Sequence, residues 1–255
     1  DTPTTLLATA MAHRAGLEVA HLEAGLRSHS LVHPFPEELI RLAVMRRADL
    51  LFAPHERAAR NLEHMRTRGR IVQLSANTSV EALRAALHDD LEAKGGGPVI
   101  VTVHRVENLH RRRVIEQLVR VVRSVVKRWP VQFVVHGPTR QVFEKRGIDS
   151  QLSSAGVELV PLLSHTEFAT HLRDAPFVIT DGGSVQEECA LLGVPTLLWR
   201  ARSERDDGLG ANVVLSRYER STIDAFLDNP EQWRREPVPA DAHPSKEIVD
   251  ELLSV

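Results

Sequence analysis

The sequence has few of the residues that would indicate a disulfide framework, a membrane span or a nucleic-acid surface. Its 255 residues include a single cysteine, Cys189, which excludes a disulfide network and a cysteine-rich metal site. No apolar run approaches the ~20 residues that a membrane-spanning helix needs. The net charge of −2 provides no basic field for nucleic acid or anionic lipid. These absences predict a cytoplasmic protein with no nucleic-acid or membrane partner.

What the sequence does contain is a regular alternation of short apolar runs with helical patterns. Runs such as 99–103 and 131–135 are typical of buried strands, and 111–128 between them has apolar residues at a period near 3.6. This alternation predicts an α/β protein whose parallel sheets carry helices on both faces. The chain is long enough for two domains, and the glycines after Lys94 mark a boundary. We therefore expect domains at 1–94 and 95–236, followed by a linker and terminal helix at 237–255.

The stretch 176–198 is the most informative local pattern. An apolar strand is followed by a turn that contains Gly182, Gly183 and Ser184, and then by a helix. A helix that begins at such a turn presents unpaired N–H groups and the positive end of its dipole to an anion. On the two glycines alone, a tight turn without a ligand fits equally well. Glu188 favours a nucleotide site, because a carboxylate there can accept ribose hydroxyls.

Other candidate residues follow the ends of predicted strands. Glu23 and His104 come directly after apolar runs, and ligands of open parallel sheets collect at the carboxyl ends of strands. Glu37 opens a predicted helix, where a carboxylate also complements the helix dipole. Taken alone, Glu37 is more often a helix-start carboxylate than a catalytic residue, and Glu23 is commonly a surface residue at the end of a strand. His136 is almost as typical of an ordinary loop histidine. The other histidines, including His165, have no spacing that indicates a metal site.

Five motifs, taken together and in order, resemble a known family. They are DTPTT at 1–5, HLEAGLRS at 21–28, PFPEE at 34–38, VHRVEN at 103–108 and DGGSVQEE at 181–188. The chain resembles the non-hydrolysing UDP-N-acetylglucosamine 2-epimerases over essentially its whole length. The resemblance implies the glycosyltransferase-B architecture, with two Rossmann-like domains and a terminal helix that crosses back onto the first domain.

The resemblance also implies the reaction and its catalytic residues. The family inverts C2 of UDP-N-acetylglucosamine to give UDP-N-acetylmannosamine, by elimination of UDP and its re-addition to a glycal. Asp1, Glu23 and Glu37 match the family's functional carboxylates and would share the proton transfers, while His104 matches its functional histidine. His104 would assist the leaving phosphate or act as an acid, and Arg41 would be an ion-pair or positioning partner one helical turn after Glu37.

Substrate contacts are carried over from the same resemblance. Gly182, Gly183 and Ser184 would hold the diphosphate, and Glu188 the ribose hydroxyls. The remaining contacts would be Arg41, Arg205 at the sugar or phosphate, Phe168 beside uracil and His136 near the substrate. The resemblance implies no metal or cofactor, because N–H groups and positive side chains can carry the charge of the leaving group. It further implies a bacterial enzyme that forms a homodimer and binds a UDP-sugar and UDP.

Two departures from the family pattern are evident in the sequence. The family usually has serine before the two glycines, whereas here the order is Gly182-Gly183-Ser184. About three βα units, or ~90 residues, normally precede the position of Asp1. We therefore expect an incomplete first domain, with a strand edge left unpaired and low activity unless the rest is present.

Three alternative functions remain open at this point. A hydrolysing 2-epimerase would admit water to the glycal and release UDP and N-acetylmannosamine. A glycosyltransferase of the same fold is disfavoured, because the spaced glutamate pair of many such enzymes is absent where Glu187 and Pro195 stand. A non-catalytic nucleotide-sugar-binding protein would keep the nucleotide site without the proton transfers.

Overall fold

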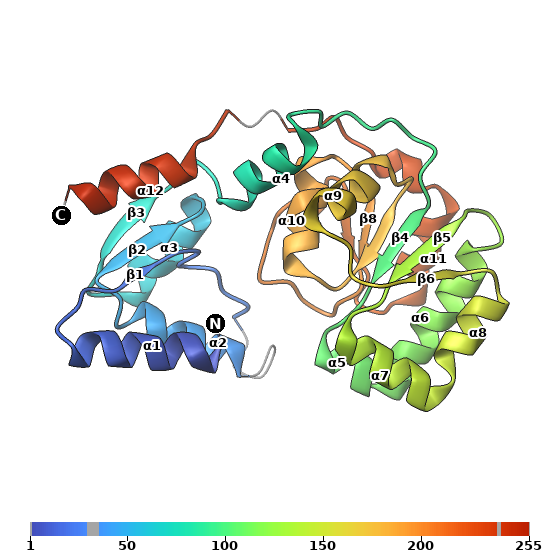
Figure 1. Cartoon of the computed structure of the whole chain (residues 1–255), viewed down its shortest axis with the longest axis horizontal. Helices are drawn as coiled ribbons and strands as arrows, with labels where there is room; N and C mark the ends of the chain where they lie inside the picture. The colour runs from blue at the N-terminus through green and yellow to red at the C-terminus, as the bar shows by residue number, and fades with distance from the viewer. Residues whose placement is uncertain (1, 30–35, 239–240, 255) are drawn as a thin grey trace. The chain divides into compact units, whose positions relative to one another are not determined.

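The computed structural model describes residues 2–29, 36–238 and 241–254. The chain forms two compact units, one of residues 1–81 with 240–255 and the other of residues 82–239 (Figure 1). Both units are α/β and contain only parallel strand pairs among the described residues. The α/β prediction is therefore confirmed.

The first unit is built on a three-stranded sheet. Its strands are β1 (Ala20–His21), β2 (Leu50–Ala53) and β3 (Arg70–Gln73), in that spatial order. Its helices are α1 (Pro3–Arg14), α2 (Glu37–Met45), α3 (Glu56–Met65) and α12 (Pro244–Leu253). Alternate residues of β2 face opposite sides, so that Leu51 packs with residues of α2 and α3 and Phe52 packs with Ile248 of α12. The sheet is thus covered on both faces.

The terminal helix α12 is anchored in this unit by polar contacts as well. Glu247 Oε2 accepts a hydrogen bond from the backbone N–H of Ser75 at 3.0 Å, and Arg70 forms an ion pair with Glu251. Figure 1 shows α12 beside β3. Two segments far apart in the chain therefore complete one layer of the first unit.

The second unit contains a six-stranded sheet in the order β6-β5-β4-β7-β8-β9. Its strands are β4 (Val99–Thr102), β5 (Val131–Val134), β6 (Glu158–Val160), β7 (Val178–Thr180), β8 (Thr196–Leu198) and β9 (Val213–Leu215). Its helices are α5 (Val106–His110), α6 (Arg112–Val125), α7 (Gly137–Arg146), α8 (Ile148–Ser154), α9 (His165–Asp174), α10 (Gly183–Leu191) and α11 (Arg220–Asp228), with a 3₁₀ turn at Pro230–Trp233. This is a Rossmann-like, doubly wound arrangement.

Each face of this sheet has its own hydrophobic core. Val101 and Ile179 pack with residues of α6 and α11 on one face, whereas Ile100 and Val178 pack with residues of α9 and α10 on the other. Cys189 lies in the second of these cores, where burial raises the pKa of its thiol to about 12. The single cysteine is therefore an inert core residue.

Helix α4 (Ser79–Leu87) crosses the division between the units, which falls after Glu81. Leu83 and Leu87 pack into a core of the second unit. This division lies upstream of the glycines at 95–97, because the second half of α4 contributes apolar side chains to the second unit.

Residues 106–110 after His104 form the short helix α5. Residues 137–154 form two helices, α7 and α8, which are separated by Gly147 in a left-handed conformation (φ 62°). Within the described ranges, no helix is both long and apolar enough to cross a membrane.

Candidate functional site

The glycine turn after β7 forms the first turn of α10. Gly182 is the N-cap residue and provides no side-chain cap, so the first N–H groups of α10 are left for an anion. A Cβ on Gly182 would lie 3.3 Å from His104 Cε1, and one on Gly183 would lie 3.3 Å from Arg205 Nε. The turn is therefore closely bordered by a histidine and an arginine. The helix begins at Gly183, earlier than expected, and includes Ser184 in its first turn.

Polar residues follow three neighbouring strands of the second sheet. His104 follows β4, His136 follows β5 and Asp181 follows β7, and the sheet order places β4 between the other two. The rings of His104 and His136 stack, and His136 Nε2 lies 3.0 Å from Thr102 Oγ1. Burial and the nearby His104 lower the pKa of His136. The structure thus brings both predicted histidines together at the carboxyl edge of the sheet.

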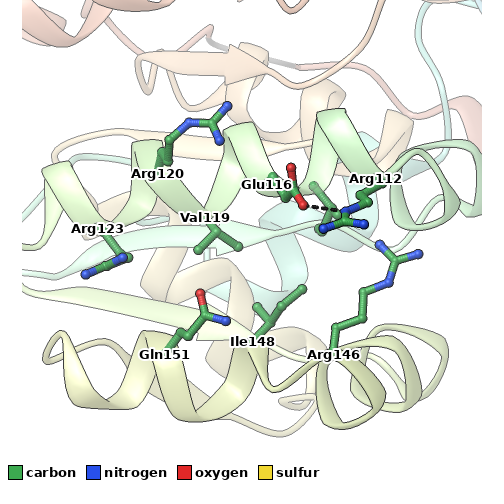
Figure 2. Close-up of a pocket in the computed structure, with 9 residues that line it drawn as sticks. Arg112, Glu116, Val119, Arg120, Arg123, Arg146, Ile148 and Gln151 are labelled. Carbon is green, nitrogen blue, oxygen red and sulfur yellow. Dashed lines mark hydrogen bonds and ion pairs between the residues drawn. The ribbon is translucent and has the colours of Figure 1, made fainter.

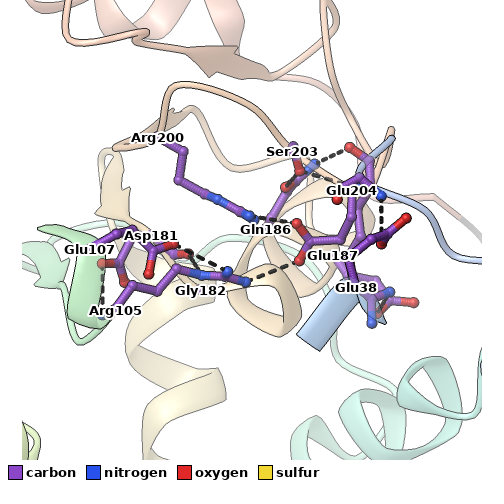
Figure 3. Close-up of polar contacts among 12 residues, drawn as sticks. Glu38, Arg105, Glu107, Asp181, Gly182, Gln186, Glu187, Arg200, Ser203 and Glu204 are labelled. Atoms are coloured by element: carbon purple, nitrogen blue, oxygen red, sulfur yellow. Dashed lines mark hydrogen bonds and ion pairs between the residues drawn. The ribbon is translucent and has the colours of Figure 1, made fainter. Parts of the chain in front are cut away.

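Asp181 is the centre of a buried hydrogen-bond network at this edge. Its side chain is fully buried and accepts hydrogen bonds from the backbone N–H groups of His104 and Arg105, each at 3.0 Å. Arg105 Nε also donates to the backbone carbonyl of Asp181 at 2.9 Å (Figure 3). The network fixes the loop that carries His104 to the start of the glycine turn. Asp181 is not among the predicted site residues, because in the sequence it is only a polar residue before a turn.

An ion cluster borders the same turn. Glu204 accepts hydrogen bonds from Arg105 at 3.0 Å and from Arg200 at 2.5 Å (Figure 3). Burial raises the pKa of the Glu204 carboxyl, but Arg200 and Arg105 outweigh burial and lower it to about 2. Glu204 therefore stays ionised and holds two guanidinium groups, and its Oε1 would lie 3.3 Å from a Cβ on Gly183.

Arg205, predicted to contact the substrate, is buried in the second unit. Its Nη1 donates to Glu187 Oε2 at 2.7 Å, and its backbone carbonyl accepts a hydrogen bond from Gln186. Both partners belong to α10, so the loop that carries Arg205 is attached to that helix. A role toward the sugar or the phosphate stays a prediction.

Glu188 has a partner that the sequence did not indicate. Its Oε1 lies 3.0 Å from Nε2 of His165, the first residue of α9. Burial raises the pKa of Glu188, although His165 opposes this effect. Phe168, one turn further along α9, is half-buried and packs against the adjacent core. The only sequence signal for His165 is its place after Ser164, which caps the helix.

In the first unit, Glu23 occupies a turn directly after β1. Its φ of 56° lies in the left-handed region, and its Oε1 accepts a hydrogen bond from Asn77 Nδ2 at 2.6 Å. Gly25 in the same turn has φ 87°, and a Cβ there would lie 2.1 Å from the carbonyl oxygen of Ala58. Backbone strain of this kind is characteristic of functional sites. Asn77 follows β3, so the strand-end rule that indicated Glu23 could have found it.

The neighbouring carboxylates of α2 have different surroundings. Glu38 is fully buried and accepts hydrogen bonds from Arg27 Nε at 2.5 Å, the Ser28 N–H at 3.2 Å and Arg41 Nη1 at 3.3 Å. The sequence predicts Arg41 as an ion-pair or positioning partner one helical turn after Glu37, and the structure gives it an ion pair with Glu38. Glu37 Oε2 has no hydrogen-bond partner among the described residues. Asp1 lies outside the described residues.

A separate hollow of about 480 Å³ lies on α6, α7 and α8 and contains none of the predicted residues (Figure 2). Four arginines, one glutamate, one glutamine and an apolar floor line it, namely Arg112, Arg120, Arg123, Arg146, Glu116, Gln151, Ile115, Val119 and Ile148.

In residues 2–29, 36–238 and 241–254, no three His, Cys, Asp or Glu side chains are grouped to hold a metal ion.

Comparisons with known proteins agree with the motifs. The family model for UDP-N-acetylglucosamine 2-epimerase matches residues 1–238. A curated UDP-N-acetylglucosamine 2-epimerase of Bacillus subtilis is 30% identical over 99% of this chain and 70% of its own length. A Methanococcus maripaludis relative of the same name is 27% identical over 83% of this chain and 61% of its own length.

Solved structures agree as well. The UDP-GlcNAc 2-epimerase of Neisseria meningitidis bound to UDP-GlcNAc matches all of this chain and 75% of its own, with 26% identity and a TM-score of 0.85. The S. aureus MnaA–UDP co-structure matches 99% of this chain and 73% of its own, with 25% identity and a TM-score of 0.82. The fold is that of the glycosyltransferase-B type. The chain belongs to the UDP-N-acetylglucosamine 2-epimerase family.

Proposed function

We propose that this protein inverts C2 of UDP-N-acetylglucosamine to give UDP-N-acetylmannosamine. Family membership supports this reaction, and the observation that carries it is the start of α10, which has no side-chain cap and lies against the ring of His104. Such a helix start binds the diphosphate of a nucleotide sugar. A histidine at the same place can supply a proton or a positive charge to a departing phosphate oxygen.

The reaction requires removal of a weakly acidic proton and departure of a good leaving group. A carboxylate takes the C2 proton, the C1–O bond breaks with its electron pair on the UDP oxygen, and a C1–C2 double bond forms. UDP then adds back to C1 while a second acid protonates C2 from the opposite face. Asp1, Glu23 and Glu37 share these proton transfers, His104 assists the leaving phosphate or acts as an acid, and Arg41 positions the carboxylates.

The second unit holds the nucleotide. Gly182, Gly183 and Ser184 hold the diphosphate at the start of α10, and Glu188, held by His165, accepts the ribose hydroxyls. The other contacts of this site are Arg205 at the sugar or phosphate, Phe168 beside uracil and His136 near the substrate. No metal is part of this scheme, because the helix start and positive side chains stabilise the leaving group.

The hydrolysing alternative is not favoured, because the curated relatives are named as 2-epimerases. The proposal includes a cytoplasmic location and a homodimeric assembly, both of which rest on the sequence-based expectations.

Product analysis tests the proposed function. The protein is incubated with UDP-N-acetylglucosamine, and ¹H and ³¹P NMR spectra are followed until they stop changing. We expect a mixture of UDP-N-acetylglucosamine and UDP-N-acetylmannosamine without continuing release of UDP. Continuing release of UDP with free N-acetylmannosamine would support the hydrolysing alternative. Binding of UDP with no change of the sugar would support a non-catalytic binding protein.

A further inference from the structure

We propose that Asp181 is a positioning residue that fixes the tautomer and orientation of the His104 ring. This inference rests on the proposed function of His104, through which Asp181 would act. The two side chains come from neighbouring strands, since His104 follows β4 and Asp181 follows β7. Asp181 Oδ1 lies 3.4 Å from Nδ1 of His104.

The Asp181 carboxylate is held rigidly. Three N–H donors approach it, from the backbone of His104 and Arg105 and from Asn108 Nδ2 at 2.8 Å. A buried carboxylate with this many donors remains a hydrogen-bond acceptor. Its position relative to the His104 backbone is therefore set independently of the imidazole.

The imidazole presents a buried nitrogen to this carboxylate. His104 Nδ1 is inaccessible to solvent and has no hydrogen-bond partner among the described residues, while the side chain as a whole is 36% exposed. A small rotation of the ring would bring Nδ1–H into a hydrogen bond with Asp181 Oδ1. Catalytic hydrogen bonds are often long without substrate and shorten in the complex.

Tyr218 fixes the orientation of the Asn108 amide. The Tyr218 hydroxyl donates to Asn108 Oδ1 at 2.6 Å, so Oδ1 is the accepting end and Nδ2 must face Asp181 and the Trp199 carbonyl. Tyr218 and Arg217 both have positive φ, at 62° and 49°. Two strained residues in succession persist only where the surroundings enforce them, and here they place the hydroxyl on Asn108.

The consequence is a defined tautomer. With Nδ1–H directed at Asp181, the proton-carrying nitrogen of neutral His104 is Nδ1, and Nε2 is the nitrogen available for proton exchange. The stacked His136 ring and the Arg105 guanidinium, which donates to the Asp181 carbonyl, also face this pair, and the Tyr218 hydroxyl interacts with Asp181. An asparagine at 181 would offer an N–H to Nδ1 and favour the other tautomer, which in a comparable Asp–His arrangement costs a factor of ~10⁴ in kcat.

The first test reads the tautomer directly and needs no turnover. Long-range ¹H–¹⁵N spectra of histidine-labelled protein, recorded at alkaline pH and assigned with His104→Gln, distinguish Nδ1–H from Nε2–H. We expect Nδ1–H in the unmodified protein and a shift toward Nε2–H in Asp181→Asn. Nε2–H in the unmodified protein would overturn the inference. Because this measurement is independent of epimerase activity, its failure is distinguishable from failure of the proposed function.

The second test is a double-mutant cycle. Asp181→Asn is expected to lower kcat by a factor of ~10³–10⁴ in the unmodified background and by less than about threefold when His104 is already glutamine. An equal loss in both backgrounds would show that Asp181 acts only through the fold.

Two further variants keep the test decisive if Asp181→Asn does not fold. Tyr218→Phe removes one of the three hydrogen bonds that orient the Asn108 amide and is expected to shift the tautomer in the same direction, with a kcat loss of about three- to tenfold. Thr139→Val is the matched control, because it removes a buried 2.7 Å hydrogen bond to the Val103 carbonyl without touching Asp181. The control is expected to leave the tautomer unchanged, and a Tyr218→Phe spectrum identical to it would contradict the inference.

Discussion

The ring of His104 stacks on the ring of His136, with centroids 4.5 Å apart and ring planes inclined by 24°. The two residues come from neighbouring strands β4 and β5 and lie at the same edge of the sheet as the glycine turn. Burial, together with the nearby His104, lowers the pKa of His136, although Asp181 opposes this effect. A neutral His136 therefore accompanies His104 at neutral pH.

We predict that His136 makes the second unit less stable as the pH falls below the ordinary histidine range. A lowered pKa in the folded state means that the unfolded chain binds a proton more readily, so protonation favours unfolding. All three tryptophans, Trp129, Trp199 and Trp233, lie in the second unit, and urea unfolding followed by their fluorescence reports on it. His136→Gln should lose part of this pH dependence; an unchanged dependence would contradict the prediction.

The buried Glu204 carboxylate should stabilise the second unit above its unfolded pKa. Its folded pKa of about 2 lies below the ordinary value of 4.5, so the stabilisation is present above pH 4.5 and is lost as the pH falls toward 2. The shift corresponds to about 3 kcal/mol of unfolding free energy. Glu204→Gln should be less stable than the unmodified protein by roughly this amount at neutral pH, and the difference should narrow at acidic pH.

Glu116 provides the matched control for this prediction. It forms a 2.7 Å ion pair with Arg112 on the exposed surface of α6. Because exposed pairs contribute little, Glu116→Gln should leave the unfolding midpoint nearly unchanged. Equal destabilisation by Glu116→Gln and Glu204→Gln would show that burial is not the cause.

His165→Ala should weaken nucleotide binding without a comparable loss of kcat. The variant removes the 3.0 Å contact that orients Glu188, and hydrogen bonds to charged groups contribute enough to raise KM by about tenfold. Titration calorimetry with UDP measures the effect directly. Thr166→Ala, at the next and exposed position of α9, should leave UDP affinity unchanged. An unaltered affinity of His165→Ala for UDP would show that His165 does not contribute to nucleotide binding.

Asn77→Ala should lower kcat by about tenfold or more, because it removes a 2.6 Å hydrogen bond to the Glu23 carboxylate. UDP affinity should be retained, since the proposed nucleotide contacts lie in the second unit. Asn61→Ala is the comparison, as Asn61 donates to the Gly25 carbonyl of the same turn at 2.8 Å but not to the carboxylate. If Asn61→Ala lost as much kcat as Asn77→Ala, the cause would be a looser turn and not the missing hydrogen bond to the Glu23 carboxylate.

The sequence predicted the parts of the fold and site that depend on local pattern. Apolar runs identified the strands, and the strand-end rule placed His104 at the carboxyl edge of the sheet. His136 was predicted from the family resemblance, and the structure stacks its ring on that of His104. The family assignment is confirmed because the UDP-N-acetylglucosamine 2-epimerase family model matches residues 1–238. Helix α5 has only five residues and no side-chain cap at Arg105, so the local pattern does not mark its start.

Long-range contacts could not be predicted in this way. Asp181 reaches His104 across 77 residues of sequence, and Asn77 reaches Glu23 across 54. Glu37 and Glu38 are equivalent as first-turn carboxylates in the sequence. About 100° of rotation around the helix separates them, and that rotation buries Glu38 against Arg27 and Arg41.

The most direct measurement of the central claim is deuterium incorporation at C2 of the sugar. The protein is incubated with UDP-N-acetylglucosamine in D₂O, and the recovered nucleotide sugars are examined by ¹H NMR. We predict loss of the C2 proton signal from product and, on approach to equilibrium, from recovered substrate, and no such exchange in Glu23→Gln or Glu37→Gln. Retention of the C2 proton in UDP-N-acetylmannosamine, or its complete retention under conditions in which UDP binds, would contradict proton abstraction by this site.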